Sequence, residues 1–359
     1  MKNYVILFLI STMSLHHVIT AVETSGLSDP KEIPVTTKNP EEKKIYPIAI
    51  IGAGAAGTMA VKRAVLNNNE VLLFTGAKQA RRCSRGNWVR KIDNIPGLGK
   101  YERPILELRN EVLQELTQSP LSHNLYVIEE SVSFIEKDID FFKLTDGTGR
   151  IYCAKYVVMA TGIMDEQPRI QGSIDPILKY ANGQTIAYCS LCDGHRSFGK
   201  KTVIIGHSES AANIALLLLE KYQLTSMTIL TNGKIHEFTP ELLKQIQNKN
   251  INILEAPIKE VLGNKEQKQL TGFVLENDHA VEADIGFIAL GIRPNNQLAL
   301  QIGAQVDESG LVITDLNGES SIPNLFIAGD LRANSMKQIY TAWQHAVDSI
   351  QLINQRIRE

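Results

Sequence analysis

Two cysteines separated by two residues are the part of this sequence best suited to chemistry. Cys189 and Cys192 form a C-x-x-C pair that is followed directly by Asp193. Such a pair can close a small disulfide ring, and mutual influence can lower the pKa of one thiol into a useful range. The same spacing supplies half of a zinc site, but zinc needs two further ligands, and Cys83 and Cys153 are isolated. We therefore expect redox chemistry and no metal site.

The composition predicts a large folded protein. The chain has 359 residues, of which 43% are hydrophobic and 21% are charged, so a sizeable core can form and general disorder is excluded. Its length suggests two or three domains. A net charge of −2 argues against a nucleic-acid partner held by bulk positive charge. Four cysteines are too few for a disulfide scaffold.

The N-terminal residues have the pattern of a leader. Lys2 precedes an apolar run, Tyr4–Ile10, that is too short for a membrane span of about 20 residues and suits the core of a signal peptide. We interpret residues 1–21 as a signal peptide and expect export to the periplasm or the medium. A true start at Met13 or an uncleaved anchor are the alternatives, and without a signal peptide the location would be cytoplasmic. Residues 22–44, rich in Pro, Thr, Lys and Glu, are expected to be a flexible linker.

A glycine-rich motif indicates a nucleotide site. Gly52–Gly57 has the pattern G-x-G-x-x-G, follows an apolar strand at 46–51 and opens a helix expected over 55–66. A further strand at 70–74 completes the context that lifts the motif above chance. The acid that would bind the ribose hydroxyls is missing, because Thr75–Gly76 ends that strand. The motif alone therefore does not decide between NAD and FAD.

Each part of the motif has a task in holding a pyrophosphate. Gly52 permits the tight turn, Gly54 has no side chain to block the phosphates, and Gly57 lets the helix pack closely on the strand. The N-terminus of the helix, at Ala55 and Ala56, presents free N–H groups and a partial positive charge to the phosphates.

Three later apolar strands end in characteristic turns, and with them the sequence resembles a known family. It is similar to the low-molecular-weight thioredoxin reductases, a branch of the flavoprotein disulfide reductases in the class II pyridine nucleotide-disulfide oxidoreductase superfamily. The resemblance runs from about Ile48 to Ile350. The matching segments are Gly52–Gly57, Phe74–Gly76, Asp93–Gly97, Ala160–Gly162, Cys189–Gly194, Gly291–Asn295, Ala328–Asp330 and Lys337–Gln338.

The resemblance implies an α/β fold with two Rossmann-like, three-layer nucleotide-binding domains. The FAD-binding domain would be discontinuous, at 45–164 and 286–359. The second domain, NAD(P)-binding-like and carrying the cysteine pair, would be inserted at 165–285. Members of this family are commonly dimers, so a homodimer is expected.

The resemblance also implies that FAD binds at the glycine-rich turn Gly52–Gly57, which we call the first cradle; the corresponding turn that begins at Gly206 is the second cradle. Thr-Gly at the end of the second strand is the family's own pattern, so the missing acid is no objection. Asp330 would hydrogen-bond the ribityl chain, and Lys337–Gln338 would lie near the isoalloxazine, with Lys337 where arginine is more usual. The residues expected to bind the cofactor are Gly52, Gly54, Ala55, Ala56, Gly57, Thr75, Gly76, Asn94, Ala160, Thr161, Gly162, Gly329, Asp330, Lys337 and Gln338.

The catalytic residues implied by the resemblance are Cys189, Cys192 and Asp193. Cys192 would face the flavin as the charge-transfer thiolate, and Cys189 would exchange with the external dithiol or disulfide. Asp193 would supply or receive the proton, because exchange needs a thiolate on one side and a protonated leaving group on the other. His195 is a second candidate for the proton, although a solvated loop histidine is the simpler interpretation.

A basic stretch around Cys83 has two interpretations. A solvated loop is the simpler one, and docking of an acidic partner is the alternative. Its residues are Arg81, Arg82, Arg85, Arg90 and Lys91, which could lower the pKa of Cys83.

A second βαβ unit repeats the first but with a damaged turn. It begins at Gly206, but Ser208 replaces the glycine that lets backbone approach a pyrophosphate, and Glu209 adds an anion there. After the next strand, at 227–230, NADPH-using members carry an arginine cluster, whereas this chain has Thr231–Lys234. One lysine does not replace a guanidinium fork. Binding of NAD(P)H is therefore doubtful.

These observations lead to three hypotheses. The first is an FAD-dependent dithiol oxidase, in which a small dithiol or a thioredoxin-like protein reduces Cys189–Cys192 and the electrons pass through FAD to oxygen or another acceptor. The second is an NAD(P)H-dependent thioredoxin or disulfide reductase with a divergent nucleotide site. The third is a flavin-binding interaction protein without turnover, against which the retained cysteine pair argues.

Overall fold

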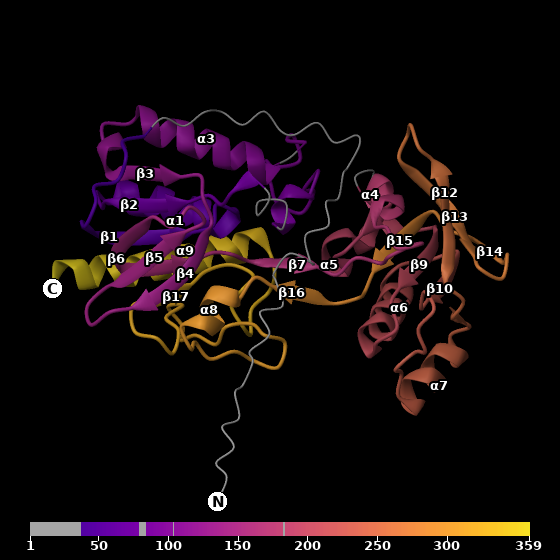
Figure 1. Ribbon diagram of the computed structural model, residues 1–359. Helices are drawn as coiled ribbons and strands as arrows, with labels where there is room; N and C mark the ends of the chain where they lie inside the picture. The colour runs from indigo at the N-terminus through magenta and orange to yellow at the C-terminus, as the bar shows by residue number, and fades with distance from the viewer. Residues whose placement is uncertain (1–36, 79–83, 103, 182–183) are drawn as a thin grey trace, which may run out of the picture. The chain divides into compact units, whose positions relative to one another are not determined.

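The computed structural model describes residues 37–359, apart from 79–83, 103 and 182–183 (Figure 1). The expected signal peptide at 1–21 lies outside the described residues. The end of the expected linker is attached to the first domain, because Thr37 Oγ1 accepts a hydrogen bond from the amide of Val127 at 3.0 Å and Lys44 pairs with Glu70 at 2.7 Å. Within the described part of the chain, no helix has the length and apolar character needed to cross a membrane.

A seven-stranded sheet forms the centre of the first domain (Figure 1). Its order is β3-β2-β1-β6-β5-β4, with β17 beside β6; the pairs β4–β5 and β5–β6 are antiparallel and the other pairs are parallel. The strands are β1 (Ile45–Ile51), β2 (Val71–Phe74), β3 (Leu125–Ile128), β4 (Val132–Lys137), β5 (Phe142–Asp146), β6 (Ile151–Met159) and β17 (Leu325–Ile327). The expected strands and the helix over 55–66 are therefore confirmed.

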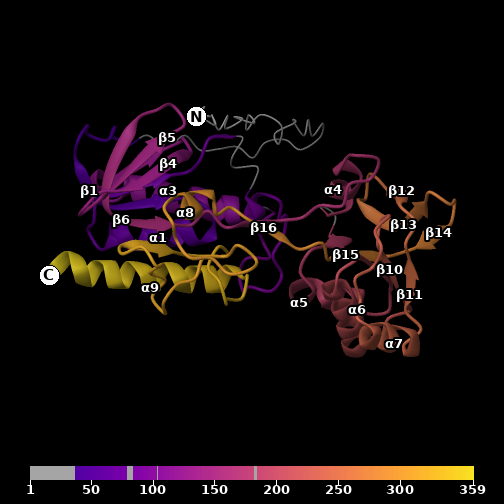
Figure 2. The ribbon, with the colours of Figure 1, turned by 60° about the horizontal axis from the view of Figure 1, so that its bottom comes forward.

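Hydrophobic side chains cover both faces of this sheet, which makes the domain three-layered. One face packs against three helices, with the alanines of α1 letting that helix lie close to α9 (Figure 2). The other face packs against α8 and the loops around it. The helices are α1 (Ala55–Leu66), α3 (Pro104–Gln118), α8 (Gln297–Gln301) and α9 (Ile339–Arg358), with short turns η2 (Arg85–Asn87) and η3 (Ser122–Asn124).

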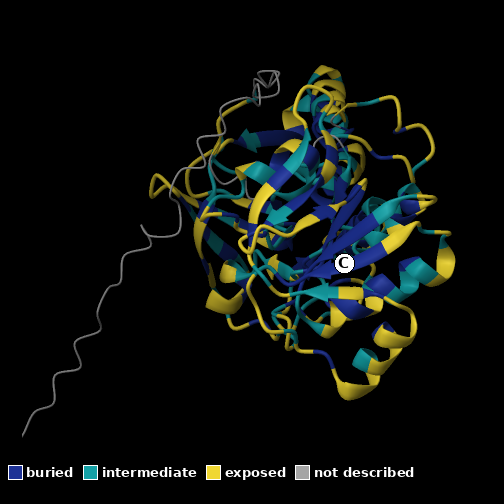
Figure 3. Cartoon of the chain, turned by 90° about the vertical axis from the view of Figure 1, so that its right-hand side faces the viewer, coloured by how far each residue is buried: buried dark blue, intermediate teal, exposed yellow. Residues whose placement is uncertain are grey.

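The second domain is built in the same way on a parallel five-stranded sheet of order β11-β10-β9-β15-β8. Helices α6 and α7 pack on one face, and α4 with the small sheet β12-β13-β14 packs on the other. Figure 3 shows buried residues along the strands of the sheets. The elements are α4 (Asp175–Ala181), β8 (Ile186–Ala187), α5 (Ser190–Asp193), η4 (Gly194–Ser197), β9 (Lys201–Ile205), α6 (Glu209–Lys221), β10 (Ser226–Leu230), α7 (Pro240–Asn248), β11 (Asn252–Leu254), β12 (Ile258–Asn264), β13 (Gln269–Leu275), β14 (Ala280–Glu282) and β15 (Ile285–Ile288).

The chain passes between the domains through two antiparallel strands, β7 (Ile163–Asp165) and β16 (Ile292–Pro294). The expected boundary between 285 and 286 is therefore misplaced, because it cuts β15, which hydrogen-bonds to β9 and β8 of the second domain. The expected boundary between 164 and 165 likewise falls inside β7. The cause is the uniform burial of Ile285–Ile288, since a strand buried on both faces fits either sheet equally well.

Candidate active site

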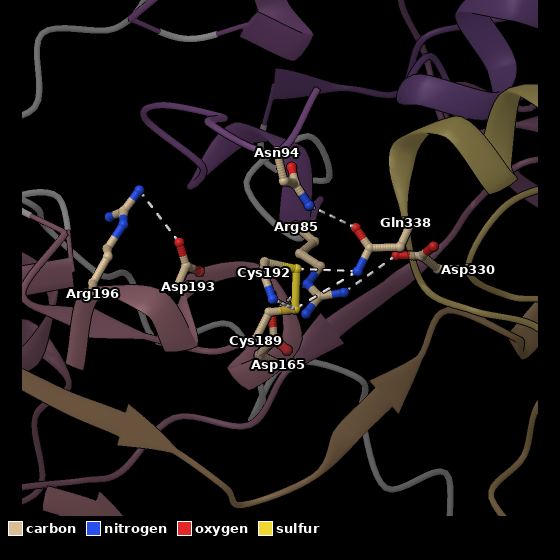
Figure 4. Close-up of a disulfide and its surroundings, with 9 residues drawn as sticks. All are labelled: Arg85, Asn94, Asp165, Cys189, Cys192, Asp193, Arg196, Asp330 and Gln338. Carbon is tan, nitrogen blue, oxygen red and sulfur yellow. Dashed lines mark hydrogen bonds and ion pairs between the residues drawn. A yellow bond between two sulfur atoms is a disulfide. The ribbon is translucent and has the colours of Figure 1, made fainter. Parts of the chain in front are cut away.

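A disulfide joins Cys189 to Cys192 at the carboxyl end of β8 (Figure 4). The sequence predicts a loop here, whereas the structure has a single helical turn, α5, that begins after Cys189. The sulfur of Cys189 accepts a hydrogen bond from the amide of Cys192 at 3.1 Å, and the carbonyl of Cys189 accepts one from the amide of Asp193 at 3.0 Å. The sulfur thus serves as the helix cap that a Ser or Asp side chain provides elsewhere. Among the described residues, no three His, Cys, Asp or Glu side chains cluster as they would around a metal ion.

The side chain of Gln338 connects the disulfide to the first domain (Figure 4). Gln338 is the N-cap of α9, and its Nε2 lies 3.1 Å from Sγ of Cys192 and 3.7 Å from Sγ of Cys189. Its Oε1 accepts a hydrogen bond from Nδ2 of Asn94 at 3.2 Å. The structure therefore brings the cysteine pair together with two of the residues that were expected to bind the cofactor.

Asp193, expected to handle a proton, is held in an ion pair. Arg196 lies 3.3 Å from Asp193 (Figure 4). It also lies 2.6 Å from Asp93, and so joins α5 to the loop that contains Asn94. Burial raises the pKa of Asp193, and the guanidinium of Arg196 is the strongest influence that opposes this rise. His195 is exposed, in agreement with its simpler interpretation.

The three glycines of the first cradle play different steric roles. Gly52 has φ +107°, and a Cβ there would lie 2.5 Å from the carbonyl oxygen of Ala160. A Cβ at Gly57 would lie 1.8 Å from the carbonyl oxygen of Gly52, so both positions require glycine for packing. A Cβ at Gly54 would meet nothing within 4 Å. Only this glycine faces open space, where the helix α1 begins at Ala55 without a side-chain cap.

The turn at Thr161, which was expected to bind the cofactor, is tied to the turn at Asn295. Thr161 Oγ1 donates to the carbonyl of Asn295 at 2.7 Å, and Nδ2 of Asn295 donates to the carbonyl of Thr161 at 2.9 Å. The amide of Asn295 also donates to the carbonyl of Gly162 at 3.0 Å. The side chain of Thr161 is thus occupied in joining the turn after β6 to the residue that follows β16.

At the end of β2 the amide and the side chain of Thr75 are both used within the domain. Thr75 is buried, and both its amide and its hydroxyl donate to the carbonyl of Ile128, at 2.9 and 3.5 Å. Gly76 follows with φ +85°, a conformation that glycine adopts without strain.

The turn after β17 carries Asp330 to the cradle. Gly329 has φ +84°, and a Cβ there would lie 2.9 Å from Cβ of Ala56, so the turn packs against the first turn of α1. Burial raises the pKa of Asp330. Lys337, by contrast, donates to the carbonyl of Arg332 at 2.6 Å and lies 3.4 Å from Oγ of Ser335, within its own loop.

Arg85 is a site residue that the sequence analysis misassigned to a solvated basic loop. Its guanidinium contacts Asp165 at 2.7 Å and Asp330 at 3.5 Å (Figure 4). These partners lie 80 and 245 residues away in the sequence, so no local pattern could indicate them. Arg90 and Lys91 do form exposed surface pairs, with Glu102 and Asp93. Arg81, Arg82 and Cys83 lie outside the described residues.

The remaining cysteine, Cys153, lies in β6 among sheet residues. Burial raises the pKa of its thiol. Because the thiolate is the reactive form, this thiol is suited to packing, as the sequence indicated.

The turn of the second cradle, which begins at Gly206, keeps its backbone fold and has Ser208 and Glu209 where the first cradle has Gly54 and Ala55. A Cβ at Gly206 would lie 2.5 Å from the carbonyl oxygen of Ala289, so this first glycine is required for packing. Ser208 caps α6 without a side-chain hydrogen bond, and Glu209 is exposed in the first turn. After β10, Thr231 donates its hydroxyl to the carbonyl of Lys234, which closes that loop on itself.

Comparison with known proteins agrees with this architecture. Residues 46–346 match the profile of the family described as pyridine nucleotide-disulphide oxidoreductase. The thioredoxin reductase of Mycoplasma pneumoniae is 28% identical over 313 residues, covering 84% of this chain and 92% of that protein. That of Treponema pallidum is 26% identical over 302 residues, covering 83% and 92%. The crystal structure of thioredoxin reductase from Streptococcus pyogenes superposes with a TM-score of 0.74 at 22% identity, covering 88% of this chain and 98% of that one, which establishes the fold.

FAD is the cofactor of the thioredoxin reductase-like enzymes, and the residues present fit it. Gly54 faces open space at the N-terminus of α1, where free N–H groups suit a pyrophosphate. Asp330 offers a largely buried acceptor beside that helix. The disulfide lies in contact with Gln338, at the start of α9. The chain therefore belongs to the pyridine nucleotide-disulphide oxidoreductase family, as a thioredoxin reductase-like oxidoreductase that acts on a disulfide.

Proposed function

We propose that the enzyme works as a dithiol oxidase. The observation that carries this proposal is the contrast between the two cradles. The first has its open glycine and its acid, while the second has Ser208 and Glu209 at the turn and a self-bonded loop after β10. A thiol substrate is then a better electron source than a pyridine nucleotide, because Glu209 repels the phosphates that a nucleotide would bring.

The proposed reaction begins with exchange at the disulfide. A substrate thiolate attacks Sγ of Cys189, the Cys189–Cys192 bond breaks, and Cys192 leaves as a thiolate. The second substrate thiol, once deprotonated, attacks the mixed disulfide and releases Cys189. The substrate dithiol has then lost two electrons and two protons and become a disulfide, and the cysteine pair has gained the electrons. The chemistry that FAD supplies when bound is acceptance of these two electrons and their transfer to oxygen or another acceptor.

The chain's own residues prepare this exchange. Gln338 donates toward both sulfurs, which stabilises a thiolate on Cys192 more than a neutral thiol. Asp193 accepts or supplies the proton, and Arg196 controls its charge. Leu191, between the cysteines, is 68% exposed. This apolar surface beside the disulfide supports a small dithiol or a thioredoxin-like protein as the substrate.

A second candidate is a conventional NAD(P)H-dependent disulfide reductase. It is favoured by the name of the family and by the relatives, which are named thioredoxin reductases. In that case the same cysteine pair works in the opposite direction, with a divergent nucleotide site.

Anaerobic reduction of the purified flavoprotein separates these candidates. We expect dithiothreitol to bleach the flavin absorbance within seconds and a matched concentration of NADPH or NADH to leave it unchanged. Rapid bleaching by NADPH contradicts the oxidase and supports the reductase. A bound flavin that neither reagent bleaches supports a flavin-binding protein without turnover.

Three further parts of the proposal have separate tests. Oxygen as acceptor predicts one hydrogen peroxide for each dithiol oxidised in air. A homodimer predicts twice the chain mass in light scattering after gel filtration. Export, suggested by the apolar run after Lys2, predicts a mature N-terminus near Ala21, which mass spectrometry of the native protein would reveal.

A further inference from the structure

Arg85 stands between two acidic side chains of the active site. Its Nε donates to Oδ2 of Asp165 at 2.7 Å, and its Nη1 lies 3.5 Å from Oδ2 of Asp330. The three side chains come from separate elements, namely η2, β7 and the turn after β17. They are largely buried, with exposed fractions of 23% for Arg85, 12% for Asp165 and 21% for Asp330. Figure 4 shows the guanidinium directed between the two carboxylates.

In the part of the chain that the structure describes, one guanidinium contacts two carboxylates, so the charges of these three side chains do not balance. Burial raises the pKa of both Asp165 and Asp330, and Arg85 opposes both rises. Asp165 holds the shorter contact, and its own charge further raises the pKa of Asp330. Asp330 is therefore the carboxyl group that depends most on a nearby cation to stay ionised.

The second cation near Asp330 is Lys337, and it is a weak substitute. Its ammonium donates to the carbonyl of Arg332 and lies near Oγ of Ser335. Burial lowers the pKa of Lys337. Among the described residues, the cation that contacts Asp330 is therefore Arg85.

We propose that Arg85 is a positioning residue for FAD, which keeps Asp330 ionised and aimed so that both of its carboxylate oxygens can accept hydrogen bonds from the hydroxyl groups of the cofactor. An ionised carboxylate only accepts, and a hydrogen bond to it is stronger than one to a neutral acid. This role concerns retention of FAD and is independent of the direction in which electrons flow. Asp165 weakens this effect on Asp330, because it binds the same guanidinium.

The sign of the pH dependence follows from the charge that FAD requires. Affinity is full where Asp330 is ionised and falls as the pH drops through the pKa of that carboxyl group. The groups that set this pKa are Arg85, Lys337 and Asp165. Removing Arg85 raises the pKa, so FAD is lost at a higher pH.

The test measures FAD binding to the apoprotein by flavin fluorescence between about pH 5 and pH 9. Arg85→Met should weaken binding about tenfold near neutral pH and move the loss of FAD upward by about one pH unit. Arg85→Lys keeps a positive charge, so its FAD affinity and the pH at which it loses FAD should lie between those of Arg85→Met and the wild type. The matched control is Arg90→Met, from the same loop, whose exposed pair with Glu102 should leave binding unchanged. Equal affinity and an unchanged pH profile in Arg85→Met overturn the proposal, as does weaker binding without any pH shift, because that result marks a merely structural residue.

A second pair of variants keeps the test decisive if Arg85→Met does not fold. Asp165→Asn removes the competing carboxylate, so the loss of FAD should move to lower pH. Asp330→Asn should abolish the pH dependence, and adding Arg85→Lys to it should have no further effect on the profile. A shift to higher pH in Asp165→Asn, or a pH dependence that survives in Asp330→Asn, overturns the assignment.

Discussion

The amide nitrogen of Gln338 lies 3.1 Å from Sγ of Cys192, which links the first residue before α9 to the redox pair. A sulfur accepts a hydrogen bond more strongly as a thiolate than as part of a disulfide. The contact therefore becomes stronger when the pair is reduced, and it stabilises the reduced state with a charge on Cys192.

Replacing Gln338 by Leu should raise the pKa of the Cys192 thiol by about one pH unit, because the thiolate loses a donor while the space stays filled. The measurement is the rate of alkylation of the reduced enzyme against pH. Gln344→Leu, at an exposed position of the same helix that bonds to Asp348, is the control and should have no effect. The same alkylation midpoint in Gln338→Leu and the wild type would contradict this role.

Cys189→Ser should slow bleaching of the flavin by dithiothreitol at least about 100-fold, because no disulfide remains for the substrate to attack. FAD affinity should not change. Cys153→Ser removes a thiol in β6 and should leave the bleaching rate at the wild-type value. Comparable rates in Cys189→Ser and the wild type would mean that dithiols reduce the flavin without the pair.

Arg196→Met should change the profile of the dithiol-exchange rate against pH: the midpoint of its low-pH side, the acid limb, should move to a higher pH by about one unit. The reason is that burial raises the pKa of Asp193, and Arg196, 3.3 Å away, is the main group that opposes it. A carboxyl group is ionised above its pKa, so a higher pKa removes its charge at a higher pH. Stopped-flow bleaching by dithiothreitol across pH measures this limb. A slower rate with an unmoved limb would assign Arg196 to structure alone, and Arg90→Met should leave both rate and limb unchanged.

Two glycine variants separate cofactor binding from folding. Gly54→Ala places a methyl group in open space, so the apoprotein should keep its unfolding free energy within about 1 kcal/mol while FAD affinity falls at least about tenfold. Gly57→Ala forces a Cβ against the carbonyl of Gly52 and should destabilise the apoprotein by more than about 3 kcal/mol. Urea unfolding and fluorescence titration measure the two effects. Equal destabilisation by both variants would refute the distinction.

Local pattern was enough to predict the cradle and the strands that form it. The helix at 55–66 has the predicted bounds, because alanines face the sheet and three asparagines end it at 67–69. Residues 286–288 of β15 were assigned to the wrong domain because the uniform burial of this strand carries no information about which sheet it joins. Arg85 and Arg196 were missed as site residues because their partners are set by tertiary contacts between distant segments.

The close approach of Gly52 to Ala160 has a counterpart in the second domain, where Gly206 approaches Ala289. In each case a Cβ on the glycine would lie 2.5 Å from the carbonyl oxygen of the alanine. The first glycine of each motif is thus required for packing within the βαβ unit, whether or not the unit binds a nucleotide. Even a domain that no longer binds a nucleotide therefore cannot replace this first glycine by another residue without a steric clash. The position that distinguishes a nucleotide site from a purely structural turn is the second glycine, because the fold does not require a glycine there. This position is Gly54 in the first domain and Ser208 in the second.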